Sequence, residues 1–300
     1  MIQGLYLVDR RHENVDEEVR LFRQTMGVDV RPLNFEDVVP IVGPGDEDGV
    51  LLTNGERLPR PDFVFTRAFR LSETESYQLK AVLRMMEGMG VLCINPADCK
   101  DITSDKLRTF QIARRVIPEI PIPKTMLIVP GTEAGQVADY IGYPVVLKVL
   151  HGEGGAGVVL VESEGELKRM LSMVSACKPG DQIIAQQAIM TSKGRDLRVM
   201  VLGDGVMGSL VRINPGNFTS NVHQGGYAAA FDAPENIKEA AVRLAKAIGI
   251  KMGSVDFLFG KNEGEFYLCE ANSSIGFNSV PGVDQNRMME LATGLLGDLR

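Results

Sequence analysis

The strongest constraint on the fold is a change in hydrophobic pattern at Thr125 of this 300-residue chain. Before that point, short apolar runs alternate with amphipathic stretches of helical period. Beyond it, apolar runs follow one another closely and are separated by glycine turns. Alternating strands and helices indicate an open α/β layer with a mainly parallel sheet, whereas closely spaced strands indicate antiparallel pairing. The sequence therefore predicts an N-terminal α/β unit followed by two mixed α+β units.

The first unit is expected to span residues 1–100. Its predicted strands are 4–9, 50–53, 62–67 and 91–95, and its predicted helices are 16–26 and 75–88. A further helix is expected to begin at Asp105, with Thr103 or Ser104 as its N-cap. The proline-rich run 117–125 follows as an extended connector.

The remaining chain is predicted to divide into residues 101–187 and 188–300. The expected strands of the first part are 125–129, 143–150, 157–163 and 181–187, with one helix at 164–176. In the second part, residues 197–213 form a predicted hairpin that turns at Gly203-Asp204-Gly205. A helix at 234–248 then precedes an antiparallel pair of strands, 253–260 and 265–272.

The composition indicates a globular protein, with 44% hydrophobic and 24% charged residues. The net charge of −7 argues against nucleic-acid binding. Because apolar runs stay well short of the ~20 residues that cross a bilayer and no signal peptide is recognisable, we expect a cytoplasmic protein without membrane association. The four cysteines lack metal-ligand spacing and are expected to be reduced and packed. A homo-oligomer, dimeric or tetrameric, is also expected.

A glycine-dense loop at 151–157 (HGEGGAG) follows the run YPVVLKVL. It contains GxGxxG, but aliphatic residues follow it where a dinucleotide-binding motif requires a helix. A glycine hairpin between strands can still fold over phosphates and donate backbone N–H groups, although a surface hairpin without a ligand is the alternative. Lys148 alternates with Val146 and Leu150 in the preceding strand. A lysine among apolar neighbours favours contact with an anion, and the alternative is a side chain that extends to solvent.

An acidic and a basic group of residues lie near the C-terminus. Glu270 and Asn272 are two apart on one strand and so point the same way, and Asp256 on the partner strand can join them. Such hard oxygen ligands suit Mg²⁺. Arg198 and Arg212 lie among apolar alternates on the two arms of the hairpin. They favour bidentate phosphate or carboxylate contacts, with structural salt bridges to Asp196 or Glu270 as the alternative.

Taken in order, these residues resemble the ATP-grasp superfamily and, within it, the RimK-like glutamate ligases. The chain resembles these ligases over about residues 100–280. The pieces that carry the resemblance are Ser104-Asp105-Lys106, GYPVVLK ending at Lys148 with its glycine loop, Gly194-x-Asp196-Leu197-Arg198, Arg212, the run 218–226 (FTSNVHQGG), Asp256 and Glu270-Ala271-Asn272.

The resemblance implies a role for each of these residues. Phosphate contacts fall to Lys106 and Lys148 and to the loop glycines Gly152, Gly154, Gly155 and Gly157. Backbone contacts with adenine fall to 186–189, including Gln187, Ala188 and Ile189. Asp196, Ser220 and Asn221 lie near the nucleotide, Arg198, Arg212 and Asn221 act at the γ-phosphate, and Asp256, Glu270 and Asn272 hold Mg²⁺ (or Mn²⁺). Two positions depart from the family pattern, namely Gln187 where glutamate is usual and Glu153 where a small polar residue is usual.

The implied fold has an N-terminal open α/β domain and two ATP-grasp subdomains with the nucleotide between them. The implied activity is an ATP-dependent carboxylate–amine ligase that works through an acyl phosphate, with glutamate or another amino acid as one substrate. The second substrate could be an amino acid, a cofactor tail, a peptide or a carrier-protein terminus, and residues 273–279 are expected to shape its site. The alternatives are a D-alanine–D-alanine-type ligase, a small-molecule kinase and a non-catalytic ATP-binding protein.

Overall fold

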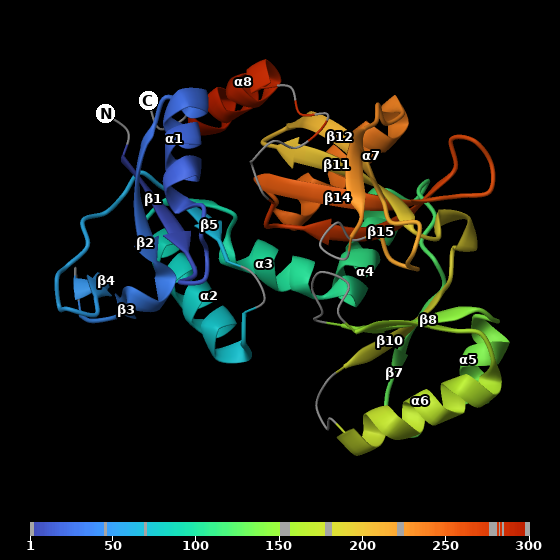
Figure 1. Ribbon diagram of the computed structural model, residues 1–300. Helices are drawn as coiled ribbons and strands as arrows, with labels where there is room; N and C mark the ends of the chain where they lie inside the picture. The colour runs from blue at the N-terminus through green and yellow to red at the C-terminus, as the bar shows by residue number, and fades with distance from the viewer. Residues whose placement is uncertain are drawn as a thin grey trace.

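The computed structural model describes residues 3–44, 47–68, 71–150, 157–177, 182–220, 225–275, 281, 283 and 285–297. In this part of the chain the strands form three larger sheets and a two-stranded hairpin. Figure 1 shows the N-terminal sheet on the left, the C-terminal sheet at the upper right and the central sheet below it. This mixed architecture confirms the predicted fold class, a parallel α/β layer followed by antiparallel units.

The N-terminal sheet is parallel and has the strand order β2-β1-β5-β6. Helices α1 and α2 pack on opposite faces of it, and the hairpin β3–β4 lies against α2. The elements are β1 (Gln3–Val8), α1 (Val15–Met26), β2 (Asp29–Asn34), β3 (Val38–Ile41), β4 (Gly49–Leu52), β5 (Phe63–Arg67), α2 (Glu73–Gly88) and β6 (Leu92–Ile94). Strands β2 and β3 are additional to the predicted elements. Strand β2 has no run of apolar residues because it lies at the edge of the sheet.

The central sheet is antiparallel, with the order β7-β10-β8-β9. Its strands are β7 (Thr125–Ile128), β8 (Val145–Val149), β9 (Val158–Val161) and β10 (Ile183–Gln187). Helices α5 (Ala134–Tyr140) and α6 (Glu164–Cys177) cover one face, where Val145, Leu147 and Ala185 are buried. Lys148 alternates with Leu147 and therefore belongs to the opposite face.

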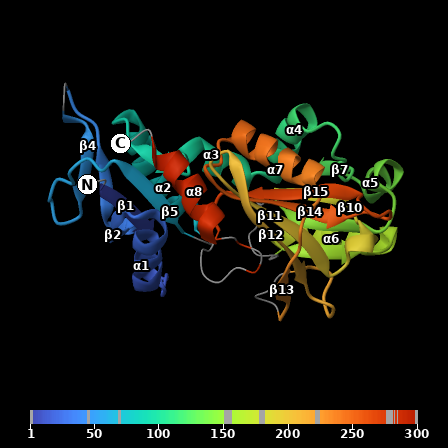
Figure 2. The ribbon, with the colours of Figure 1, turned by 90° about the horizontal axis from the view of Figure 1, so that it is seen from above.

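The C-terminal sheet is antiparallel and has the order β13-β12-β11-β14-β15. Its strands are β11 (Arg195–Leu202), β12 (Gly205–Ile213), β13 (Tyr227–Ala230), β14 (Met252–Phe259) and β15 (Phe266–Asn272). The predicted hairpin turn at Gly203-Asp204 and the predicted last strand pair are confirmed. Helices α4 (Lys106–Val116) and α7 (Glu235–Ile248) cover one face, whereas α8 (Gln285–Leu296) packs on the other face and also against α1 (Figure 2).

The start of α4 differs from the prediction. A separate helix, α3 (Ala97–Ser104), precedes it, so Thr103 and Ser104 end one helix instead of capping the next. The side chain of Asp105 accepts a hydrogen bond from the backbone N–H of Arg108 at 2.9 Å and is the actual N-cap. Thr103 instead donates its hydroxyl to the backbone oxygen of Cys99, four residues earlier. The expected cap at Thr103 or Ser104 is therefore wrong.

The proposed domain limits fall at definite places in the fold. Residue 100 lies inside α3, and residue 187 is the last residue of β10. The division into 1–100, 101–187 and 188–300 remains a prediction. Within the residues described above, no helix is long and apolar enough to pass through a bilayer.

Asn95, just after β6, ties the N-terminal sheet to the C-terminal sheet. Its Nδ2 donates to the backbone oxygens of Met252 and Ser273, each at 2.6 Å. Its Oδ1 accepts from the backbone N–H groups of Lys251 (2.6 Å) and Met252 (2.9 Å). Only 1% of Asn95 is exposed, so water cannot replace these four bonds. The amide therefore fixes the start of β14 and the segment after β15 against the N-terminal unit.

We predict that Asn95→Ala lowers the thermal midpoint by roughly 5 °C or more, because it leaves buried backbone groups without partners at about 1–3 kcal/mol each. Differential scanning calorimetry measures the shift. The control is Asn54→Ala, since exposed Asn54 makes one local hydrogen bond to the N–H of Glu56. Equal midpoints for the two variants would contradict the assignment of Asn95 as a clamp.

Candidate active site

The residues predicted to act at a phosphate or metal lie together on one face of the C-terminal sheet. Cross-strand register places Arg198 opposite Asp256, and Asp256 opposite Glu270. Asp196 lies opposite Arg212, and Asn272 lies opposite Ser254. Since directly opposed residues in antiparallel strands point to the same side, these side chains form one polar field. We call this set, Asp196, Arg198, Arg212, Ser254, Asp256, Glu270 and Asn272, the polar face.

Asp256 is the centre of the polar face. Arg198 donates to it from both Nε (2.8 Å) and Nη2 (2.7 Å), and Arg212 donates from Nη2 at 2.8 Å. Arg212 also pairs with Asp196, with Nε 2.8 Å from Oδ1. The Asp256 side chain has 0% exposure, so protein groups, chiefly these two guanidiniums, compensate its charge in place of water. The pairing of Arg212 with Asp196 matches the structural salt bridge considered as an alternative from sequence.

Burial and charge act in opposite directions on the two aspartates. Burial favours the neutral acid at Asp256, but the charges of Arg198 and Arg212 outweigh it and lower the pKa to about 2. At Asp196, burial raises the pKa above its ordinary value, and Arg212 offsets this only in part. Burial lowers the pKa of Arg212, but Asp256 and Asp196 outweigh it and raise the pKa above its ordinary value. Asp256 and Arg212 are therefore ionised at neutral pH.

The chemistry of the donor set fits a hard divalent cation. Glu270 lies opposite Asp256, and Asn272 Nδ2 bridges the two carboxylates at 3.4 and 3.2 Å. Two opposed carboxylates repel each other unless a cation offsets them. Rotation of the Asn272 amide would present Oδ1, in place of Nδ2, to a cation between the two carboxylates. Groups of three or more His, Cys, Asp or Glu suited to a metal do not occur among the described residues, but Mg²⁺ often uses one or two carboxylates together with substrate phosphates.

A β-bulge shapes this part of β15. The register shifts so that Asp256 pairs with Glu270 while Phe257 pairs with Leu268, which leaves Cys269 as the extra residue. The bulge lets Leu268 and Ala271 both face the core that α4 and α7 cover, while Glu270 and Asn272 stay on the polar face. Without it, regular alternation would place Leu268 on the same face as Glu270 and Asn272 instead of in the core.

Lys148 lies within electrostatic range of the polar face. Burial raises the pKa of the Cys269 thiol to about 12; the charge of Lys148 lowers it, while Glu270, Asp196 and Asp256 raise it. The pKa of this one thiol thus depends on the lysine of the central sheet and on the acids of the C-terminal sheet. Lys148 Nζ donates to Gln186 Oε1 at 2.7 Å, and Lys106 Nζ donates to the backbone oxygen of Leu150 at 3.4 Å. Lys106 therefore contacts the strand end that leads into the glycine loop, two residues beyond Lys148.

The other predicted nucleotide residues are placed as follows. The backbone N–H groups of Gln187 and Ala188 donate to the backbone oxygens of Lys124 (2.8 Å) and Pro144 (3.2 Å). These two N–H groups are therefore occupied, which leaves the expected adenine contact of this segment to Ile189 and to carbonyl oxygens. Ser220 is buried, and Gly157 has a φ of 73° just before β9. Gly152, Glu153, Gly154, Gly155 and Asn221 lie outside the described residues.

Residues 103–295 match the model of the RimK-like ATP-grasp domain. The chain belongs to the RimK-like ATP-grasp family. Among curated proteins it resembles a probable alpha-L-glutamate ligase of Rhodopirellula baltica, at 32% identity over 76% of this chain and 54% of that protein. It also resembles a probable alpha-L-glutamate ligase 2 of Shewanella sp., at 33% identity over 76% of this chain and 74% of the relative. This RimK-like chain thus spans about half the length of the first relative.

Solved structures with the same fold include the ATP-grasp ligase PsnB complexed with a precursor variant, Mg and ADP. The TM-score is 0.73 at 18% identity, covering 99% of this chain and 98% of that chain. The VanG D-Ala:D-Ser ligase from Enterococcus faecalis gives a TM-score of 0.73 at 18% identity, covering 98% and 99%. The likeness includes the N-terminal unit, which the family model does not cover, and it concerns the fold alone.

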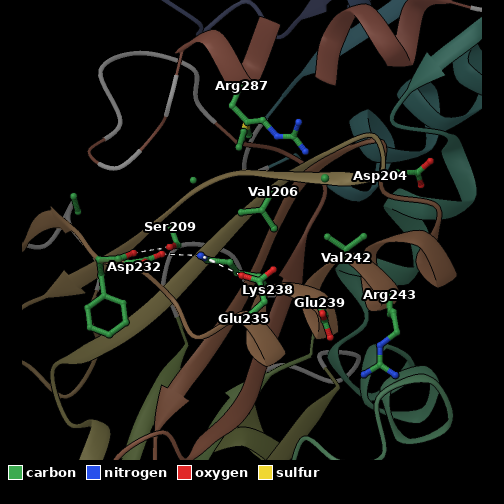
Figure 3. A pocket seen from close by; sticks show the side chains of 15 residues that line it. Asp204, Val206, Ser209, Asp232, Glu235, Lys238, Glu239, Val242, Arg243 and Arg287 are labelled. Carbon is green, nitrogen blue, oxygen red and sulfur yellow. Dashed lines mark hydrogen bonds and ion pairs between the residues drawn. The ribbon is translucent and has the colours of Figure 1, made fainter. Parts of the chain in front are cut away.

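A separate hollow of about 1190 Å³ lies beside β12, with α7 on one side and Arg287 of α8 on the other (Figure 3). It is lined by residues 204–209 of the β11–β12 turn and β12, by residues 230–232 and by one edge of α7, and by none of the polar-face residues. Lys238 Nζ lies 2.7 Å from Asp232 Oδ1 inside it. Ser209, another lining residue, is three residues from Arg212 on β12, so the two side chains point to opposite faces of the sheet.

One residue of the RimK-like site and one side-chain contact were not expected from the sequence. Ser254 donates its hydroxyl to Asp256 Oδ1 at 3.3 Å, and its position two residues before Asp256 is a signal that could have revealed it. Gln186 was expected only as part of the backbone segment 186–189, but its side chain accepts from Lys148 and donates to the hydroxyl of Thr125 at 2.9 Å. Sequence alone does not predict this pairing, because it depends on strand register across the central sheet.

We predict that Asp256→Asn destabilises the protein by about 3–5 kcal/mol, because two buried guanidiniums lose the carboxylate that they share. Urea unfolding at pH 7 measures the loss. The control is Asp232→Asn, whose side chain is 90% exposed and whose ion pair should contribute less than about 1 kcal/mol. A loss for Asp256→Asn no larger than that of the control would contradict the shared-carboxylate network.

The stability difference between wild type and Asp256→Asn should also depend on pH. The pKa of Asp256 is lowered from 3.8 to about 2 in the folded protein, so its contribution is complete above pH ~4 and is lost as the pH falls towards 2. The free energy of unfolding of each protein is measured at pH 7, 4, 3 and 2, and the difference between the two proteins should narrow only below pH ~4. A difference that stays constant down to pH 2 would count against this assignment.

Proposed function

We propose that this chain is an ATP-dependent carboxylate–amine ligase that uses Mg²⁺ and takes glutamate or a similar amino acid as one substrate. The observation that carries the proposal is the convergence of Asp256, Glu270 and Asn272 with two arginines on one sheet face of a RimK-like ATP-grasp chain. The names of the curated relatives support glutamate. The PsnB complex with Mg and ADP supports ATP and Mg²⁺.

In the proposed reaction a substrate carboxylate oxygen attacks the γ-phosphorus of ATP, and ADP leaves. Lys106 and Lys148 bind phosphate oxygens, and Arg198 and Arg212 stabilise the charge that gathers on the transferred group. Mg²⁺ held by Glu270 and Asn272, with Asp256 beside them, would neutralise phosphate charge. The amine then attacks the carbonyl of the acyl phosphate, loses a proton and expels inorganic phosphate, which leaves an amide. Because Asp256 already accepts bonds from both arginines, its main proposed task is to orient them.

The remaining roles stay part of the proposal. The loop glycines 152, 154, 155 and 157 cover the phosphates and exclude water from the acyl phosphate. Asp196 and Ser220 lie beside the nucleotide, with Asn221 at the γ-phosphate, and Ile189 contacts adenine. Mn²⁺ can replace Mg²⁺, and the partner of glutamate is an amino acid, a peptide-like small molecule or a carrier-protein terminus. The enzyme acts as a cytoplasmic homo-oligomer.

An ADP-release screen over pairs of amino acids and peptides, followed by mass spectrometry of the products, tests the ligase. An amide product with free phosphate is expected; a phosphorylated product would indicate a kinase, and ATP binding without turnover of any pair would indicate a non-catalytic protein. D-alanine and D-serine belong in the screen because VanG shares the fold.

We predict that Glu270→Gln lowers turnover by at least about 100-fold, since it removes a metal-binding charge without changing side-chain size. The matched control is Glu263→Gln, because Glu263 is exposed in the turn between β14 and β15. Steady-state ADP release measures both, with thermal midpoints to verify folding. Wild-type turnover in Glu270→Gln would refute the site.

A further inference from the structure

The N-terminal unit contains a buried ionic cluster that the proposed reaction does not use. Its centre is Glu18 on α1, whose side chain has 0% exposure. Arg67 Nη1 lies 2.9 Å from Glu18 Oε1, and His12 Nε2 lies 2.5 Å from Oε2. The hydroxyl of Tyr6 donates to the same Oε2. One carboxylate thus fixes the guanidinium of Arg67, which is 16% exposed, from one side.

The position of this cluster is one where open α/β sheets bind ligands. In the order β2-β1-β5-β6, the chain runs from β1 to β2 on one side and later to β5 on the other. The topological switch point therefore lies between β1 and β5, and ligands of such sheets bind beyond the carboxyl ends of the strands there. Arg67 is the last residue of β5 and pairs with Val8, the last residue of β1. A buried ion pair contributes little net stability, so a binding role explains it better.

Arg67 also faces the segment that leaves the proposed metal site. Its Nη1 donates to the backbone oxygen of Ile275 at 3.2 Å. Ile275 follows Asn272 by three residues, which span at most about 10 Å of chain. Between them, the hydroxyl oxygen of Ser274 is buried and has no hydrogen-bond partner in the described part of the chain. A small substrate with one end at Asn272 can therefore reach Arg67 with the other.

We propose that Arg67 binds a carboxylate of the amino acid that supplies the amine, with Glu18 as a positioning residue that holds the guanidinium. The inference rests on the proposed function and names the substrate class as anionic amino acids. Such a substrate carries its own carboxylates, which compete for the γ-phosphate unless they are held away from it. Arg67 anchors one of them beyond the metal site, Ser274 donates its hydroxyl to the same group, and the amine faces the acyl phosphate. Arginine suits this task because its planar fork matches a carboxylate.

The test compares Arg67→Met with wild type in steady-state assays with glutamate, glutamine and isoglutamine. We expect the KM for glutamate to rise about 10- to 100-fold, the loss of a charged hydrogen bond, with the KM for ATP within about twofold of wild type. Wild type should discriminate against the amide that lacks the bound carboxylate, and the variant should lose this discrimination. Glu18→Gln should raise the KM for glutamate by less. The control is Arg60→Met, because Arg60 also donates to a backbone oxygen of the N-terminal unit, that of Gly90, but precedes β5.

A second variant guards against misfolding. Arg67→Met leaves Glu18 buried without its cation, so the double variant Glu18→Gln/Arg67→Met removes both charges and should fold. Unchanged glutamate KM and unchanged amide discrimination in this double variant would overturn the inference while leaving the ligase proposal intact. If wild type forms no amide from any pair of substrates, the proposed function fails. The inference about Arg67 is then tested by calorimetric titration of glutamate into each protein with ADP and Mg²⁺ present. Binding to wild type but not to the double variant supports the inference, and equal binding or none overturns it.

Discussion

The site depends on one buried carboxylate shared by two guanidiniums. Asp256 accepts bonds from Arg198 on β11 and Arg212 on β12, and Arg212 binds Asp196 in turn. This chain of charges joins three neighbouring strands on one face. A slip of any strand by one residue would turn its charged side chain into the apolar core that α7 covers. Burial of an unpaired charge there would cost free energy. The charges therefore specify the register of these strands as well as the chemistry of the site. Strand β15 adds Glu270 and Asn272 beside side chains whose positions the ion pairs already set.

The parts of this arrangement that the sequence predicts are those governed by local periodicity. The hairpin at Gly203-Asp204 and the pair β14–β15 follow from alternation and turn residues alone. The shared orientation of Glu270 and Asn272 follows from their spacing of two on a strand. The family resemblance then orders these pieces into one site, which the match over residues 103–295 bears out at the level of the family.

The parts that the sequence does not predict depend on contacts between distant segments. The bulge at Cys269 is not apparent from periodicity, because its effect appears only when β14 is laid beside it. The cap of α4 was misassigned because Thr103, Ser104 and Asp105 are all good N-cap residues, and only the end of α3 distinguishes them. For Arg198 the sequence predicts a bidentate contact with phosphate or a carboxylate, with a salt bridge to Asp196 or Glu270 as the alternative, but it does not identify the partner found here, Asp256 on another strand. Local patterns give the residue types but not their partners.

The clamp at Asn95 has a mechanical consequence. Four bonds from one amide join the N-terminal sheet to the ends of β14 and β15, so these two units form a single frame that carries both Arg67 and the polar face. The central sheet is attached differently. The chain reaches this sheet after Pro121, whose backbone oxygen accepts a hydrogen bond from the N–H of Leu268 at 3.0 Å. A short connection then joins β10 to β11. The spacing between Arg67 and the polar face is therefore set within this frame, and the central sheet, which carries Lys148, takes no part in setting it.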